Sequence, residues 1–135
     1  MKQNPAGYSG TPLPKKLGIK PGMTVSVIRA PSGFAEILGE LPEGAKLRSG
    51  ARRPGGLVIW FVKSTDELGS EMRRVVGFTA GAPLWIAWRK KRAQPSENAV
   101  RDAGLAAGLV DYKVCAIDAT WSGLLFAPRR NESAT

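Results

Sequence analysis

Apolar residues along the chain follow two patterns that alternate from one segment to the next. Unbroken apolar runs at residues 57–62 and 83–88 are typical of strands that are buried on both faces of a parallel sheet. Apolar residues three and four positions apart at residues 34–41 predict an amphipathic helix that ends at Pro42. Strands that alternate with helices indicate a parallel sheet with helices on both of its faces.

Capping residues predict the ends of three further helices. An N-cap side chain accepts a hydrogen bond from a free amide at the helix start, and a glycine adopts the left-handed conformation that ends the helix. The pairs of N-cap and terminal glycine are Thr11 and Gly18, Ser64 and Gly77, and Ser96 and Gly108. In the second of these helices, Glu67 completes a capping box with Ser64.

Four further segments complete the predicted sheet. They are residues 24–29, residues 45–48 at an edge, and residues 110–117 and 124–127 at the end of the chain. The last two strands are joined by a short turn, so they are expected to pair antiparallel. The sequence therefore predicts a single Rossmann-like α/β domain over residues 11–130, mostly parallel, with a C-terminal antiparallel hairpin. Residues 1–10 and 131–135 are expected to be a flexible arm and a flexible tail.

Length and composition fit one such domain and indicate an anionic partner. The chain has 135 residues, of which 43% are hydrophobic, and it has no apolar run long enough to span a membrane. Its net charge of +9 favours nucleic acid, a phosphorylated small molecule or an acidic protein as partner, although such a charge also serves solubility alone. The only cysteine, Cys115, excludes an internal disulfide, and a cytoplasmic location is the simplest interpretation.

Cations follow three of the predicted strands at their carboxyl ends. In open α/β sheets ligands bind outside these ends, at the point where the strand order reverses. A helix start after the first strand would add backbone N–H groups to the same edge. The sequence thus predicts an anion site, or alternatively a solvated basic rim, formed by Arg29, Ser32, Gly33, Lys63, Arg89, Lys90 and Lys91.

Residues for other chemistry are few. The chain has no histidine, the most common general base, and no cysteine–histidine cluster that would bind a metal, so we predict neither catalytic nor metal-binding residues. Cys115 lies within a strand and is interpreted as a buried thiol. Trp85 and Trp88 adjoin the basic run, which suits base stacking, but their apolar strand favours core packing. Asp118 is interpreted as a turn-forming residue.

Several segments of the chain resemble those of S-adenosylmethionine (SAM)-dependent methyltransferases, whose sheet also ends in an antiparallel hairpin. They are residues 17–25, 81–88, 106–109 and 121–123. The chain resembles more closely a short bacterial family catalogued only as a domain of unknown function. That likeness is carried by residues 7–13, 15–21, 33–34, 38–42 and 118–123.

The resemblance implies a truncated methyltransferase-like fold without one strand–helix unit, with no assigned activity and with SAM as a possible cofactor. The usual cofactor motif is glycine-rich after the first strand and acidic at the end of the second. Here the first position reads Arg29-Ala30-Pro31-Ser32-Gly33, and Lys46 and Arg48 lie near the second. No cofactor-binding residue is therefore carried over.

Three functions remain open at this point. The sequence favours a noncatalytic cytoplasmic domain that binds an anionic ligand or partner at the carboxyl ends of the strands. The alternative is a divergent transferase that binds an adenosine-type cofactor by other contacts, and its mark would be an open, partly apolar crevice at the strand ends. The second alternative is nonspecific nucleic-acid binding, for which steep salt dependence is expected.

Overall fold

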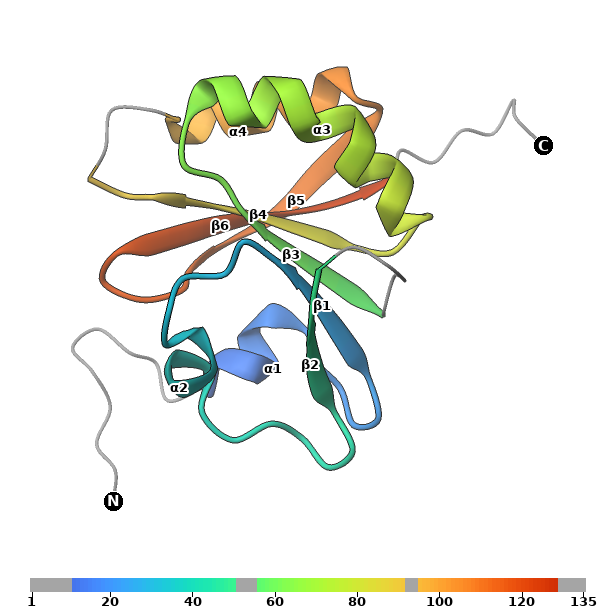
Figure 1. Ribbon diagram of the computed structural model, residues 1–135, viewed down its shortest axis with the longest axis vertical. Coiled ribbons are helices and arrows are strands. Elements are labelled where there is room, and N and C mark those ends of the chain that lie inside the picture. Colours follow the sequence, from blue (N-terminus) through green and yellow to red (C-terminus); the bar gives the residue numbers. More distant parts are fainter. Residues whose placement is uncertain (1–10, 51–55, 92–94, 129–135) are drawn as a thin grey trace.

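A single mixed sheet organises the molecule in a computed structural model that describes residues 11–50, 56–91 and 95–128 (Figure 1). The strand order is β2-β1-β3-β4-β6-β5. The strands are β1 (Thr24–Ile28), β2 (Lys46–Ser49), β3 (Leu57–Phe61), β4 (Leu84–Arg89), β5 (Leu109–Ala116) and β6 (Trp121–Pro128). The predicted flexible arm and tail lie outside the described residues.

The direction of the strands confirms the predicted fold class. Strands β2, β1, β3 and β4 are parallel neighbours, whereas β6 is antiparallel to both β4 and β5. Because β5 is antiparallel to β6, it runs in the same direction as β4. The chain leaves β1 toward β2 on one side and returns to β3 on the other, so the strand order reverses at the ends of β1 and β3.

The helices divide between the two faces of the sheet (Figure 1). Helices α3 and α4 cover one face, and α1 and α2 lie against the other. Their bounds are α1 (Leu13–Leu17), α2 (Phe34–Leu38), α3 (Thr65–Thr79) and α4 (Glu97–Ala106). At about 1.5 Å rise per residue, the 15 residues of α3 extend about 22 Å, but the five of α1 or α2 extend only about 7.5 Å. The α1/α2 face is therefore the less completely covered one.

Three predicted helix ends are wrong. The helix that begins at Phe34 stops at Leu38, because Gly39 has a φ of 80° and leaves the helical conformation before Pro42 is reached. The helix capped by Ser64 continues through Gly77 to Thr79, because an interior glycine costs a helix only about 1 kcal/mol. At the first helix Pro12, not Thr11, is the N-cap.

Both faces of the sheet are packed with large side chains. Trp85 and Trp88 are 0% and 5% exposed, which confirms their prediction as core residues. The indole N–H of Trp85 donates to the Leu17 carbonyl at 2.8 Å and so ties α1 to the sheet. Cys115 is buried as well, and burial raises the pKa of its thiol. Trp85, Trp88 and Cys115, which the sequence analysis considered for base stacking and thiol chemistry, thus belong to the core.

Candidate anion-binding site at the carboxyl edge

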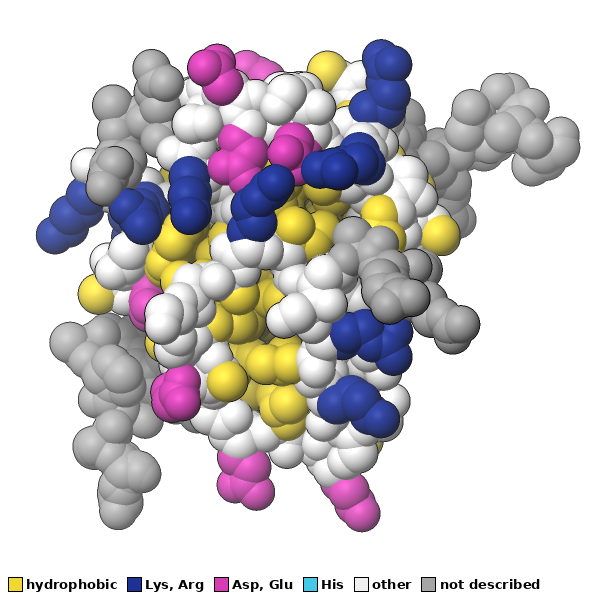
Figure 2. All heavy atoms as spheres, in the orientation of Figure 1, with side chains coloured by type: hydrophobic (Ala, Val, Ile, Leu, Met, Phe, Trp, Pro, Cys, Tyr) yellow, Lys and Arg dark blue, Asp and Glu magenta, His cyan; other side chains and the backbone are white. Residues whose placement is uncertain are grey.

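The three cationic strand ends lie along one edge of the sheet. Arg29 follows β1, Lys63 comes two residues after β3, and Arg89 is the last residue of β4. These strands are parallel neighbours, so their carboxyl ends face the same way. Figure 2 shows a row of Lys and Arg side chains across the molecule, with carboxylates beside part of the row and a hydrophobic hollow below it.

At the β1 end of this edge, Arg29 is held by acidic residues of α3. Its Nη1 lies 2.9 Å from Glu67 Oε2 and 2.8 Å from Glu71 Oε1, and its Nη2 lies 3.0 Å from Glu71 Oε2. Glu71 also accepts a 2.8 Å hydrogen bond from Arg74. The two carboxylates balance the charge of Arg29, whose backbone adopts a left-handed φ of 57°. This cluster joins the end of β1 to α3 across the switch point.

The acid stability of the fold is expected to depend on Glu71. Hydrogen bonds from Arg29 and then Arg74 lower the pKa of Glu71 to about 2, from 4.5. A carboxylate with a lowered folded pKa stabilises the native state above its unfolded pKa, and this stabilisation is lost as the pH falls through the folded value. Carboxylates titrate roughly between pH 6 and pH 2. Over this range the melting temperature should therefore fall less steeply for Glu71→Gln than for the parent chain.

A matched control is Glu36→Gln, which removes one carboxylate from the exposed surface of α2. Its melting profile should keep the slope of the parent chain. Equal slopes for the parent chain and Glu71→Gln would contradict the ion-pair cluster.

Other predicted residues near this end make few contacts through their side chains. Lys63 is exposed, and its backbone N–H donates to Glu67 Oε1 at 3.0 Å. Ser32 is exposed, and Gly33 is the N-cap of α2 with a φ of 85°. The amide of Phe34 already donates to the Pro31 carbonyl, so the start of this short helix offers fewer amides than predicted.

Arg89, at the β4 end of the edge, has different surroundings. It is half-buried and lies opposite Trp121 in the β4–β6 ladder, with its guanidinium carbon 5.4 Å from the centre of the Trp121 ring. Its Nε–H is buried and has no hydrogen-bond partner among the described residues. Among the residues that the structure describes, no carboxylate forms an ion pair with Arg89. The positive charge of Arg89 is thus uncompensated, in contrast to that of Arg29.

Two phenylalanine rings pack in series beneath the ring of Trp121, on the core side. The rings of Trp121 and Phe61 are 5.0 Å apart and perpendicular, and those of Phe61 and Phe34 are 4.9 Å apart in a similar arrangement. Edge-to-face contacts of this kind fix ring positions. The Trp121 ring under the Arg89 guanidinium is therefore packed into the core.

Lys90 and Lys91 follow Arg89 directly. The backbone N–H of Lys90 donates to the Thr120 carbonyl at 2.8 Å, which holds the end of β4 against the β5–β6 turn. In that turn Asp118 Oδ1 accepts hydrogen bonds from the amides of Thr120 and Trp121, at 2.8 and 2.7 Å. Asp118 therefore forms the turn, as predicted. Lys91 is exposed.

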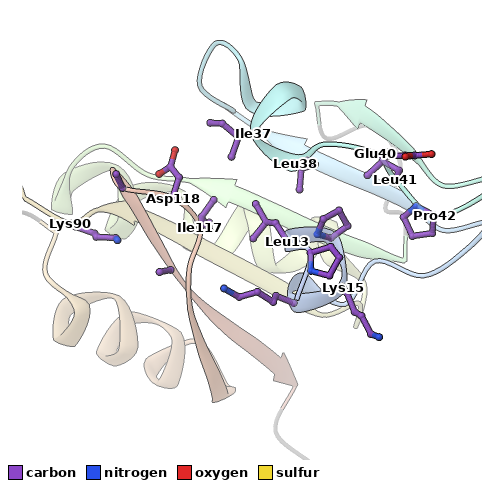
Figure 3. A pocket seen from close by; sticks show the side chains of 15 residues that line it. Leu13, Lys15, Ile37, Leu38, Glu40, Leu41, Pro42, Lys90, Ile117 and Asp118 are labelled. Atoms are coloured by element: carbon purple, nitrogen blue, oxygen red, sulfur yellow. The ribbon is translucent and has the colours of Figure 1, made fainter. Parts of the chain in front are cut away.

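An open pocket of about 1040 Å³ lies on the α1/α2 face, between α1, the α2 segment and the β5–β6 turn (Figure 3). Of the predicted site residues only Lys90 lines it. Its apolar lining includes Leu13, Ile37, Leu38, Leu41 and Ile117, and its charged lining is Lys15, Lys16, Glu40, Lys90 and Asp118. Sequence reasoning missed this pocket because four segments that are far apart in the sequence form it. The shortness of the helices flanking the first strand was its only signal.

Comparison with solved structures identifies the architecture. A SAM-dependent methyltransferase from Aquifex aeolicus aligns over 83% of this chain and 85% of its own, with 15% identity and a TM-score of 0.55. Magnesium protoporphyrin IX methyltransferase from Synechocystis PCC 6803, with bound SAM, aligns over 87% and 74%, with 12% identity and a TM-score of 0.52. The fold is methyltransferase-like. A protein of the NADB-Rossmann superfamily from Streptococcus agalactiae aligns over 95% and 73%, with 8% identity and a TM-score of 0.57.

Sequence identities this low establish a shared fold, but they establish no shared function or ligand. No family model matches the chain. No curated protein matches it either. The resemblance to a family of unknown function therefore stays a prediction, whereas the methyltransferase-like architecture is confirmed.

The residues at the switch point do not fit SAM, the cofactor that the fold implies. The side chain of Arg29 bridges to α3 where a glycine-rich loop would leave space, and β2 ends in Arg48 and Ser49 without an acid. Within the described part of the chain, no cluster of three or more acidic, cysteine or histidine side chains could hold a metal ion. No helix among these residues is long and apolar enough to cross a membrane.

Proposed function

We propose that this chain is a noncatalytic domain that binds an anionic ligand at the carboxyl edge of the sheet, with Arg89 and Lys90 as the principal contacts. The half-buried guanidinium of Arg89, which forms an ion pair with none of the described carboxylates, carries the proposal. A carboxylate or phosphate would compensate this positive charge, and a planar guanidinium suits such groups.

The remaining predicted residues take lesser roles in this proposal. Lys63 and Lys91 are exposed cations that would raise the local concentration of anions without fixing their position. Arg29 is neutralised by Glu67 and Glu71, so we assign it to holding the edge together more than to ligand contact. Ser32 and Gly33 lie in the loop between β1 and α2.

Replacing Arg89 with glutamine is expected to weaken binding of inorganic phosphate and phenyl phosphate at least tenfold. Tenfold corresponds to about 1.4 kcal/mol, close to the lower end of the range for a charge-assisted hydrogen bond. Isothermal titration calorimetry on the parent chain and the variant measures the ratio. Arg89→Lys, which keeps the charge and loses the planar fork, should fall between them.

A matched control is Arg73→Gln, which removes an exposed arginine of α3 and so lowers the net charge equally. Arg73→Gln should bind both probes like the parent chain. Equal losses in the Arg73 and Arg89 variants would show that net charge alone attracts the anion, and would overturn the proposed site.

A divergent transferase is the alternative, and the open pocket at the ends of β4 and β5 favours it. This pocket is the partly apolar crevice that an adenosine-type cofactor would need, although it lies away from the switch point. Thermal unfolding with added SAM distinguishes the two functions. A saturable rise in melting temperature that Ala119→Trp abolishes would support the transferase, because Ala119 lines the pocket.

The nucleic-acid alternative loses its proposed stacking surface. Trp85 and Trp88 are buried, so they cannot stack on bases. A basic surface remains, and its contribution would appear as a steep dependence of affinity on salt concentration.

A further inference from the structure

The pocket and Arg89 lie on the same face of the sheet. Trp85 and Ala87 of β4 pack in the core on the α1/α2 face, and side chains alternate along a strand, so Arg89 points to this face as well. Trp121, whose ring lies under the Arg89 guanidinium, belongs to the same core layer. Lys90 joins the two features, because it follows Arg89 and lines the pocket.

The charged lining of the pocket favours an anion near an apolar body. The lining contains three lysines, Lys15, Lys16 and Lys90. It contains only two carboxylates, those of Glu40 and Asp118. One oxygen of Asp118 is already occupied by two backbone amides.

Lys113 adds a further positive charge on this side of the sheet, near the buried thiol of Cys115. Burial raises the pKa of this thiol, while the charges of Lys16, Lys113 and Lys90 act in the opposite direction. The α1/α2 face near the pocket is thus positively charged around an apolar floor.

The size and lining of the pocket indicate what else the ligand carries. A volume of about 1040 Å³ far exceeds the need of a phosphate or carboxylate alone. Leu13, Ile37 and Ile117 line it with aliphatic surface, which gains most from contact with apolar groups of a ligand. A purely polar metabolite would leave that surface without a favourable partner.

We propose that the pocket takes the acyl or aryl body of a soluble amphipathic anion, whose carboxylate or phosphate meets Arg89 and Lys90. This inference rests on the proposed function and adds the class of ligand to it. The head group supplies charge complementarity at the end of β4, and the body is buried between α1, α2 and the β5–β6 turn.

The test is a homologous series of alkyl phosphates, from ethyl to octyl, titrated calorimetrically as monomers in solution alongside inorganic phosphate. Burial of each methylene should tighten binding by about two- to fourfold until the pocket is filled. Ala119→Trp, which narrows the pocket from the side of the β5–β6 turn, should flatten this dependence on chain length. Leu41→Gln, which makes the opposite wall polar, is a second pocket variant and should do the same. Ala106→Trp places the same bulk on α4, on the other face, and should change nothing.

The outcomes separate this inference from the proposed function. Arg89→Gln should weaken every member of the series by one common factor and leave the gain per methylene intact. Binding of inorganic phosphate with no dependence on chain length would overturn the inference and leave the proposed function standing. No binding of any anion would overturn both. A gain per methylene that survives both pocket variants, or binding only to vesicles containing phosphatidic acid, would place the apolar body elsewhere or at a membrane and overturn the inference.

Discussion

Replacing Gly104 with alanine is expected to lower the free energy of unfolding by about 3 kcal/mol, at the upper end of ordinary overpacking. Gly104 is a buried residue of α4 that faces β6. A Cβ at this position would lie 2.1 Å from Cε2 of the Phe126 ring and 2.6 Å from its Cζ. Phe126 is 0% exposed, so its ring has no free space to move into. The clash can be relieved only by moving α4 off the sheet.

Chemical denaturation followed by circular dichroism measures this loss. The matched control is Gly69→Ala, also within a helix, where nothing lies within 4 Å of the added Cβ. That change should stabilise the fold by about 0.5–1 kcal/mol, because alanine is the better helix former. If the two variants unfold alike, then α4 does not lie as close to β6 as the structure places it.

Truncating Phe61 to alanine is expected to cost about 3–5 kcal/mol, the usual range for a buried phenylalanine. Phe61 is 0% exposed at the end of β3 and contacts the rings of Phe34 and Trp121 edge to face. Its loss leaves a cavity between α2 and the β5–β6 turn. Because Trp121 then loses its support, phosphate binding through Arg89 should weaken as well.

Two measurements test this prediction: denaturation for stability, and calorimetry with phenyl phosphate for the site. Tyr112→Ala is the control, since it removes an aromatic ring that is 59% exposed on β5. Its effect on stability should stay within about 0.5 kcal/mol, and its effect on phosphate binding should be absent. A Phe61 variant as stable as the Tyr112 variant would contradict the aromatic cluster.

Much of the fold follows from local sequence. The apolar runs now seen as β3 and β4 consist of residues whose side chains must be buried on both faces, which requires interior strands of a sheet that is covered on both sides. Ser64 and Ser96 accept hydrogen bonds from amides three residues on, as their capping patterns predict. Helix ends are less certain from sequence, because a glycine such as Gly39 or Gly77 ends a helix in one packing environment and is tolerated in another.

The candidate site divides in the same way. The sequence by itself determined which cations follow the strands, since strand ends are local features and parallel strands share an edge. Only the tertiary structure decided which of these charges are compensated. Arg29 meets Glu67 and Glu71 from 38 and 42 residues away, whereas Arg89 meets the ring of Trp121 and no carboxylate of the residues that the structure describes. The pocket likewise needs α1, α2 and the β5–β6 turn together. Periodicity and capping act over a few neighbouring residues, but charge pairing and cavities depend on segments that meet only when the chain folds.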